Sequence, residues 1–132
     1  MREFPPMPAE KARLLNPLQL AYIGDAVWDM LIRMNLIHSG RNLRHMHQEA
    51  IRTVCAKAQA AALEKVLPHL DEQEQDIVRR GRNTHAKHPC PKNQDPADYA
   101  AATGFEALLG YLYLTGSEER LMTLYHITQQ EV

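Results

Sequence analysis

The sequence predicts an all-α fold, a compact helical bundle, on three observations. Apolar residues recur at intervals of three and four along several long segments, as they do on the buried face of a helix. Asn, Asp or Ser stands before several of these segments, twice with Gln or Glu three residues later, which is the pattern of a helix N-terminus. No segment alternates apolar and polar residues as a half-buried strand does, and no internal repeat is visible.

Length and charge limit the classes of protein to consider. A chain of 132 residues favours one domain, and a net charge of −1 means that any nucleic-acid binding would need a local basic patch. Two cysteines, Cys55 and Cys90, make no disulfide framework and fit a reducing compartment, although one bridge stays open. Because the chain has neither a signal peptide nor an uncharged apolar run of about 20 residues, we expect a cytoplasmic protein without a membrane partner.

The N-terminal part divides into an arm and a first helix. Three prolines in the first eight residues predict an extended arm over residues 1–15. Asn16 and the following proline then start a helix over residues 17–37, and Gln19 is placed to complete a capping box. Gly40 follows the end of this helix. Its residues are apolar on nearly every side, so we expect it to be buried at the centre of the domain.

Two more helices are expected in the middle part of the chain. Apolar spacing and a run of alanines predict one long helix over residues 43–67, which Pro68 ends. Asp71 starts the next helix with a capping box to Glu74. Two arginines and Gly81 mark its end, because cations and glycine are favoured at helix C-termini.

An irregular loop and two further helices complete the expected bundle. The loop is rich in Pro, Asn and His and spans residues 80–96, RGRNTHAKHPCPKNQDP. Asp95 and the following proline start a helix that ends near residue 114, and Asp98 is placed for a capping box. Ser117 is then expected to cap a last helix.

Asp25 is out of place in the first helix. It stands in the middle of an apolar stretch, and Gly24 precedes it. A buried ionised carboxylate needs a cation or hydrogen bonds, and a glycine inside a helix suggests that another backbone comes close. Two unfavourable choices side by side often mark a functional site. The alternative is that Asp25 belongs to a polar stripe with Asp29 and Arg33, four residues apart.

Glu106 repeats this pattern in the helix that begins at Asp95. It is the only charged residue between residues 99 and 116, with Gly104 before it and Gly110 after it. Two buried carboxylates on separate helices can meet on a divalent cation, and Mg²⁺ is suited to one or two carboxylates with several waters. Such a cation activates water and neutralises phosphate charge. The alternative is that Glu106 reaches the surface or pairs with an arginine.

A basic segment suggests where a nucleic acid would bind, if the protein binds one. Between residues 79 and 92 there are five lysines and arginines and no acid. Double-stranded RNA is recognised largely by shape, through cations and hydroxyl or amide groups that face phosphates and 2′-hydroxyls. The candidate RNA-binding residues are Arg79, Arg80, Arg82, Asn83, Thr84 and Lys87. The alternative is a solvated helix end. Arg41 and Arg44 are weaker candidates.

The histidines and cysteines give little support to a zinc site. His85, His88 and Cys90 lie close together, but their spacing matches no familiar zinc finger. The sequence also contains neither a Gly-rich phosphate loop nor a serine nucleophile elbow.

Two motifs carry a resemblance to a known family. The stretch YIGDAVWDMLIR resembles the signature helix of the ribonuclease III catalytic domain, and ATGFEALLGYLYLTG resembles the second acidic motif of that family. Both occur in order, with RRGRN between them, over most of the chain. The chain is most similar to Mini-ribonuclease III, which is the catalytic domain without a double-stranded-RNA-binding domain. On this resemblance, residues 1–15 form the arm and residues 16–132 the catalytic domain.

The resemblance implies an all-helical homodimer that cleaves double-stranded RNA with Mg²⁺, for which Mn²⁺ can substitute. Asp25 and Glu106 match the catalytic and metal-binding carboxylates, and Tyr22 matches the aromatic residue at the dimer interface. The implied substrate is the precursor of 23S ribosomal RNA, with a ribosomal protein as a possible further partner.

Two positions depart from the full-length enzymes of the family. Ala21 stands where they carry a glutamate, and Thr103 stands where they carry an aspartate. With only two carboxylates, water must fill more of the coordination sphere, and a second metal would be held weakly. The departures leave open a binding module for RNA or ribosome assembly that has lost cleavage. A helical metal-dependent phosphohydrolase acting on nucleotides is a third interpretation.

Overall fold

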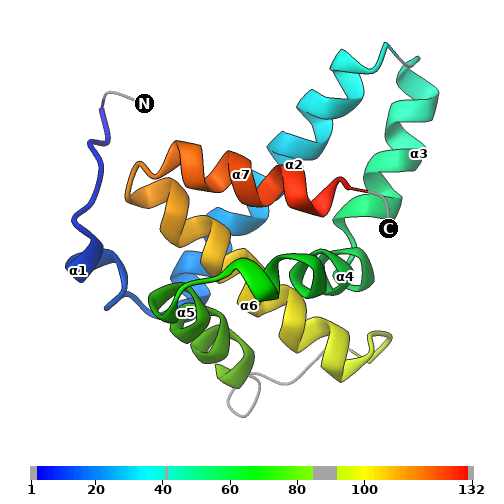
Figure 1. Ribbon diagram of the computed structural model, residues 1–132. Coiled ribbons are helices and arrows are strands. Elements are labelled where there is room, and N and C mark those ends of the chain that lie inside the picture. Colours follow the sequence, from blue (N-terminus) through cyan, green and yellow to red (C-terminus); the bar gives the residue numbers. More distant parts are fainter. Residues whose placement is uncertain (1–2, 41, 85–91, 131–132) are drawn as a thin grey trace.

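The computed structural model confirms the all-α class. It describes residues 3–40, 42–84 and 92–130, and these residues form helices and connections with no strand (Figure 1). The helices are α1 (Ala9–Ala12), α2 (Pro17–His38), α3 (Leu43–Val54), α4 (Ala56–Val66), the 3₁₀ turn η1 (Leu67–His69), α5 (Glu72–Asn83), α6 (Pro96–Leu114) and α7 (Glu118–Thr128). Within the described residues, no helix combines the length and apolar character that crossing a membrane requires.

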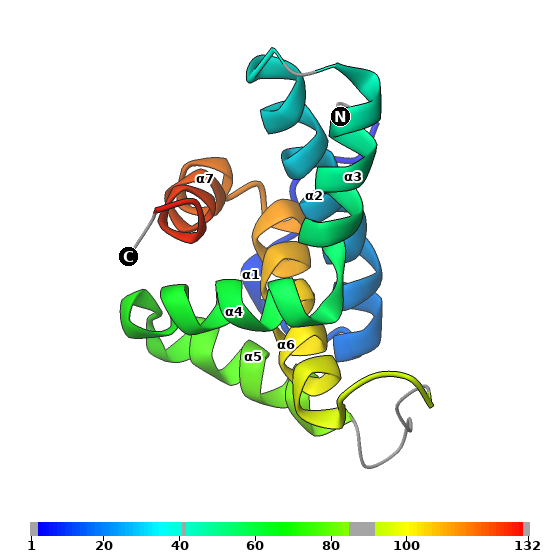
Figure 2. The same ribbon diagram turned by 90° about the vertical axis from the view of Figure 1, so that its right-hand side faces the viewer.

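The centre of the bundle is α6. It packs against α2, α4, α5 and α7, and every residue from 101 to 112 is buried except Glu106 (Figures 1 and 2). The expectation that the first helix is the buried centre is therefore wrong. Helix α2 buries one side against α6 and exposes apolar residues on the other, because the two helices meet along one face only.

Two predicted helix starts are confirmed and two differ in detail. Capping boxes form between Asn16 and Gln19 and between Asp71 and Glu74, since each pair exchanges side-chain and backbone hydrogen bonds. Asp95 caps α6 alone, by accepting from the Ala97 N–H at 2.8 Å. Ser117 caps nothing with its side chain; its hydroxyl instead hydrogen-bonds to the Thr115 hydroxyl at 2.8 Å.

The long second helix is interrupted at Cys55, so that prediction is wrong. Cys55 has an extended backbone, with φ −69° and ψ 160°, and separates α3 from α4. The indole N–H of Trp28 on α2 donates to the carbonyl of Thr53 at 3.0 Å. This carbonyl is the one that a continuous helix would have used for its own ladder, so a contact from another helix stabilises the break. Helix α3 then follows α2 away from the rest of the bundle (Figure 2).

Two further boundaries differ from the expectation. The N-terminal arm contains the short helix α1 and is held to the end of α6, because the Met7 N–H donates to the Leu114 carbonyl at 2.8 Å. Helix α5 continues through Gly81 to Asn83. Gly81 does not end the helix. It lies instead where α5 packs closely against Gly104 of α6.

Candidate active site

Two glycines bring α2 and α6 into backbone contact. A Cβ atom on Gly24 would lie 1.7 Å from the Glu106 carbonyl oxygen, and one on Gly110 would lie 1.9 Å from the Leu20 carbonyl oxygen. Real Cβ atoms do not approach other atoms so closely, so only glycine fits at either position. The residue after Gly24 is Asp25, and the backbone of Glu106 is what Gly24 touches. The crossing therefore places the two isolated carboxylates together.

A second pair of glycines joins α5 to α6. A Cβ atom on Gly81 would lie 2.8 Å from the Gly104 Cα, and one on Gly104 would lie 2.7 Å from the Val78 carbonyl oxygen and 3.2 Å from the Arg82 Cγ. The close approach lays the side chain of Arg82 against α6, two residues before Glu106. Gly104, noted beside Glu106 in the sequence, thus leaves room for the aliphatic part of the Arg82 side chain against α6.

Asp25 and Glu106 form a hydrogen-bonded carboxyl pair. The pKa of Glu106 is raised from its ordinary value of 4.5 to about 8, chiefly by burial and then by the hydrogen bond and the charge of Asp25. A hydrogen bond from Gln59 acts the opposite way and lowers the pKa. Asp25 is exposed, because α2 is buried on one side only, and Glu106 is half-buried. The expectation of two buried carboxylates is therefore met in part by Glu106 and not by Asp25.

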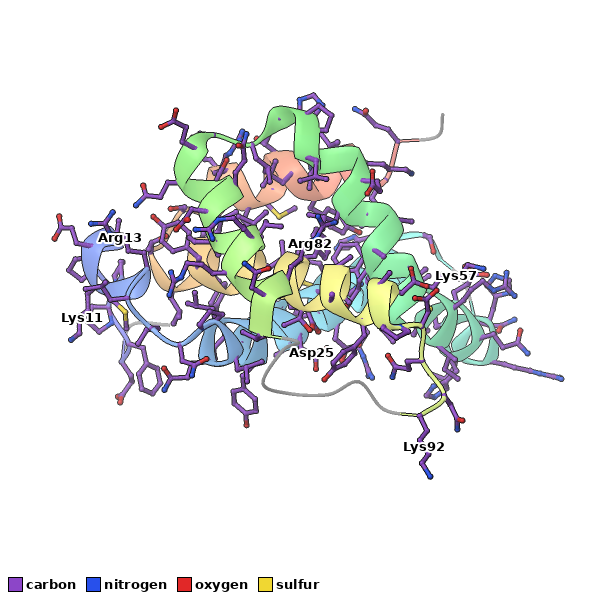
Figure 3. All side chains as sticks on the ribbon, turned by 90° about the horizontal axis from the view of Figure 1, so that it is seen from below. Lys11, Arg13, Asp25, Lys57, Arg82 and Lys92 are labelled. Atoms are coloured by element: carbon purple, nitrogen blue, oxygen red, sulfur yellow. The ribbon has the colours of Figure 1, made fainter. Side chains whose placement is uncertain are left out.

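The polar stripe considered for Asp25 is only partly formed. Arg33 pairs with Asp29, with 3.0 Å between Nε and Oδ1, whereas the carboxyl of Asp25 meets Glu106. Figure 3 shows Asp25 in a view from below, with Arg82 of α5 and Lys57 at the start of α4. Among the described residues, no ion pair includes Asp25 or Glu106.

The carboxyl pair fits a divalent cation with few protein ligands. Both donors are carboxyl oxygens, and no lysine, arginine or histidine among the described residues forms an ion pair with either of them. In the part of the chain that the structure describes, no group of three or more His, Cys, Asp or Glu could hold a metal. Ala21 is buried, and the buried Thr103 donates its hydroxyl to the Tyr99 carbonyl at 3.0 Å. The two departures from the family pattern therefore add no ligand.

The candidate RNA-binding residues do not all have free side chains. Arg79 pairs with Asp76, and Arg80 donates to the backbone carbonyls of Arg13 and Leu15, which fixes the segment before α2. The Thr84 hydroxyl donates to the Gly81 carbonyl at 2.7 Å. Arg82 is half-buried and Asn83 is exposed at the end of α5. Lys87 lies outside the described residues, as do His85, His88, Cys90 and Arg41 of the sequence analysis.

Sequence reasoning did not single out Gln59 on α4. Its amide N–H donates to the Oε2 of Glu106 at 3.4 Å, and its side chain is 2 % exposed. The available signal was a lone polar residue at a position where helical spacing from Ala62, Leu63 and Val66 predicts an apolar one.

The carboxyl pair makes metal-free stability depend on pH. The pKa of Glu106 is about 8 in the folded protein, and its ordinary value of 4.5 applies to the unfolded chain. Between pH 4.5 and about 8 the folded state therefore binds more protons than the unfolded state. The free energy of unfolding therefore falls as pH rises from 4.5 to about 8. We expect Glu106→Gln to melt at a higher temperature than wild type in EDTA at high pH, with little difference at acidic pH. The measurement is the melting temperature of wild type and Glu106→Gln at a series of pH values, with Glu64→Gln, at an exposed position, as the control. A difference in melting temperature between wild type and Glu106→Gln that stays the same at every pH would contradict the expectation.

Comparison with known proteins identifies the family of the chain. The ribonuclease III domain model matches residues 18–117. Mini-ribonuclease 3 of Symbiobacterium thermophilum is 55% identical over 108 residues, which cover 81% of this chain and 82% of the relative. The Thermoanaerobacter protein of the same name is 44% identical over 119 residues, covering 89% of this chain and 83% of the relative. A Fusobacterium nucleatum protein with a crystal structure superposes with a TM-score of 0.78 at 30% identity, covering 87% of this chain and 92% of that one. The chain belongs to the ribonuclease III family, among the Mini-ribonuclease III proteins, and is an endoribonuclease.

Proposed function

We propose that this endoribonuclease cleaves double-stranded RNA with Mg²⁺, and that Mn²⁺ can substitute. The observation that carries the proposal is the contact between the Asp25 and Glu106 carboxyls, to which the described residues offer no cation within ion-pair distance. A divalent cation removes the repulsion that arises when both groups are ionised. The family acts on double-stranded RNA and generally depends on a divalent metal, which supports the same proposal.

The residues around the pair have separate roles in this proposal. Asp25 and Glu106 would hold the cation, with the carboxyl of Glu106 in its ionised form. When bound, Mg²⁺ would activate water for attack on a phosphodiester and stabilise the charge that develops on the phosphate. Asp25 is on the exposed side of the pair, where an RNA backbone can reach it. Arg82 would place a guanidinium near the bound phosphates.

The proposed natural substrate is the duplex at the ends of the 23S ribosomal RNA precursor, presented by a ribosomal protein. It rests on the likeness to the Mini-ribonuclease III proteins. The test is incubation of the wild-type protein with a long RNA duplex and with a precursor duplex, with and without Mg²⁺. We expect Mg²⁺-dependent fragments with 5′-phosphate and 3′-hydroxyl ends. Binding without cutting, in both Mg²⁺ and Mn²⁺, would favour the RNA-binding or ribosome-assembly module instead.

Cation contacts to RNA can be tested on a single helix. We expect Arg82→Ala to weaken binding of double-stranded RNA. The slope of log affinity against log salt concentration should become shallower by about one, which corresponds to the loss of one phosphate contact. Arg79→Ala is the matched comparison, because Asp76 already engages that guanidinium. Filter binding over a range of salt concentrations measures both. Equal losses in the two variants would argue against a special role for Arg82, while Asn83, Thr84 and Lys87 remain proposed contacts.

The exposed side of α2 is the proposed dimer interface. Tyr22 is 81 % exposed, and Met30, Met34 and Ile37 continue an apolar stripe along the same helix. An exposed apolar patch of this length is unfavourable in a monomer. We expect Tyr22→Asp to shift the protein from dimer to monomer in sedimentation velocity. Ile51→Asp, at an exposed apolar position on α3, is the control. A dimer that persists in Tyr22→Asp would contradict this assignment.

A further inference from the structure

Gln59 is a polar residue in an apolar interface. The buried face of α4 that packs against α6 consists of Gln59, Ala62, Leu63 and Val66, which follow one another at helical spacing. The other three are apolar, and Gln59 is 2 % exposed. Burying an amide without hydrogen bonds is unfavourable, so an apolar side chain would suit the α4–α6 interface better. The amide must therefore be explained by what it contacts.

The contact that Gln59 makes is with the candidate active site. Its Nε2 lies 3.4 Å from the Oε2 of Glu106, and this bond joins residues 47 positions apart in the sequence. Among the described residues, Asp25 and Gln59 are the side chains that hydrogen-bond to the Glu106 carboxyl. Asp25 approaches from α2 and Gln59 from α4, so the carboxyl of Glu106 is held between two other helices. An N–H donor from one side restricts the rotamers that this carboxyl can adopt.

The chemistry of an amide suits this position better than that of other side chains. A lysine or arginine would pair with the carboxylate and take the place of a divalent cation, whereas an acid would add a third negative charge. An aliphatic side chain would leave the Glu106 carboxyl free to turn. A neutral donor stabilises the ionised carboxylate while it leaves the negative charge available to a cation, as residues behind metal ligands commonly do.

We propose that Gln59 is a positioning residue of the nuclease, which orients the Glu106 carboxylate toward Asp25 for binding of the divalent cation. The inference rests on the proposed metal-dependent function of this pair. Gln59 acts through Glu106 and touches neither the substrate nor the cation. Its loss should therefore change the affinity for the cation and leave the affinity for RNA unchanged.

The test compares substitutions that remove the amide and keep the volume. Gln59→Met and Gln59→Leu both suit the apolar α4–α6 interface, so at least one should fold. The control is Gln75→Met on α5, which loses a hydrogen bond of 3.0 Å to the Leu70 carbonyl. Mn²⁺ is titrated by calorimetry into each protein without RNA. Cleavage of a long RNA duplex is then measured over a range of Mg²⁺ concentrations, with kcat and KM determined separately.

We expect the Gln59 variants to bind Mn²⁺ about 10- to 100-fold more weakly and to need correspondingly more Mg²⁺ for half-maximal cleavage. At saturating Mg²⁺, kcat should recover to within a few-fold of wild type, and KM for RNA should not change. Gln75→Met should behave as wild type in both assays. Unchanged Mn²⁺ affinity in the folded Gln59 variants would overturn the inference and leave the proposed function intact. A wild-type protein that neither binds Mn²⁺ nor cleaves RNA would overturn both.

Discussion

Replacing Asp25 with asparagine is expected to lower RNA cleavage at saturating Mg²⁺ on the order of 10³-fold or more, because one of the two carboxylates proposed to hold the cation is lost. Asparagine keeps the shape of the side chain and removes its charge. Asp25 is exposed, so the substitution removes no core packing. Burial is the main cause of the raised pKa of Glu106, and the substitution removes the smaller contribution that the charge of Asp25 makes. This favours folding of the metal-free protein at neutral pH.

The measurement is single-turnover cleavage of a long RNA duplex together with its equilibrium binding. Asp29→Asn is the matched control, since it makes the same change one turn later on α2, at a carboxylate that pairs with Arg33. Asp29→Asn should cleave within a few-fold of wild type. Loss of cleavage in Asp25→Asn with unchanged RNA affinity supports the nuclease mechanism. Equal cleavage by the two variants would remove Asp25 from the active site.

Gly110→Ala is expected to destabilise the protein by more than about 3 kcal/mol, which is a large part of the stability of a small domain. The new Cβ would lie 1.9 Å from the Leu20 carbonyl oxygen and 3.1 Å from the Gly24 backbone nitrogen. These are backbone atoms inside α2 and cannot rotate away as a side chain could. The two helices would have to separate along the crossing that joins Asp25 to Glu106.

The sign of the change in the free energy of unfolding distinguishes the close contact from helix propensity, since propensity alone predicts that Gly110→Ala is stabilising. Alanine is more favourable than glycine by about 1 kcal/mol in a helix interior, so without the close contact Gly110→Ala would stabilise α6. The comparison is Gly40→Ala, where nothing lies within 4 Å of a new Cβ and the cost arises only from the backbone φ of 74°. Gly40→Ala should cost about 1 kcal/mol. Urea denaturation of both variants would contradict the close contact if Gly110→Ala proved as stable as wild type.

Local chemistry made several features predictable from the sequence. The capping boxes at Asn16 and Asp71 depend on hydrogen bonds within three residues, so the sequence contains everything that they need. Asp25 and Glu106 could be singled out because each is an isolated charge in an apolar helix beside a glycine. The glycines further indicated that another backbone comes close, which the structure confirms at Gly24.

Other features of the site depend on contacts between helices. Arg80 is one of several cations in the sequence, and its role in holding the Arg13 and Leu15 carbonyls depends on how α5 packs. Gly81 has the position of a helix end, yet α5 continues because Gly81 lies against Gly104. Gln59 appears in the sequence as one polar residue among alanines. Its proposed role depends on its hydrogen bond to Glu106, which is 47 residues later in the sequence.

The sequence by itself determined that the protein is helical, where most helices begin, and that Asp25 and Glu106 are the two carboxylates to explain. Only the tertiary structure decided that α6 is the buried centre, that α2 keeps an exposed apolar side, and that Gln59 supports Glu106. The physical reason is the distance along the sequence over which each interaction acts. Caps and helical periodicity arise from atoms within a few residues of one another, whereas burial and pKa depend on which helices touch. The packing of α2 against α6 is fixed at backbone contacts such as those of Gly24 and Gly110, which join atoms that are distant in the sequence.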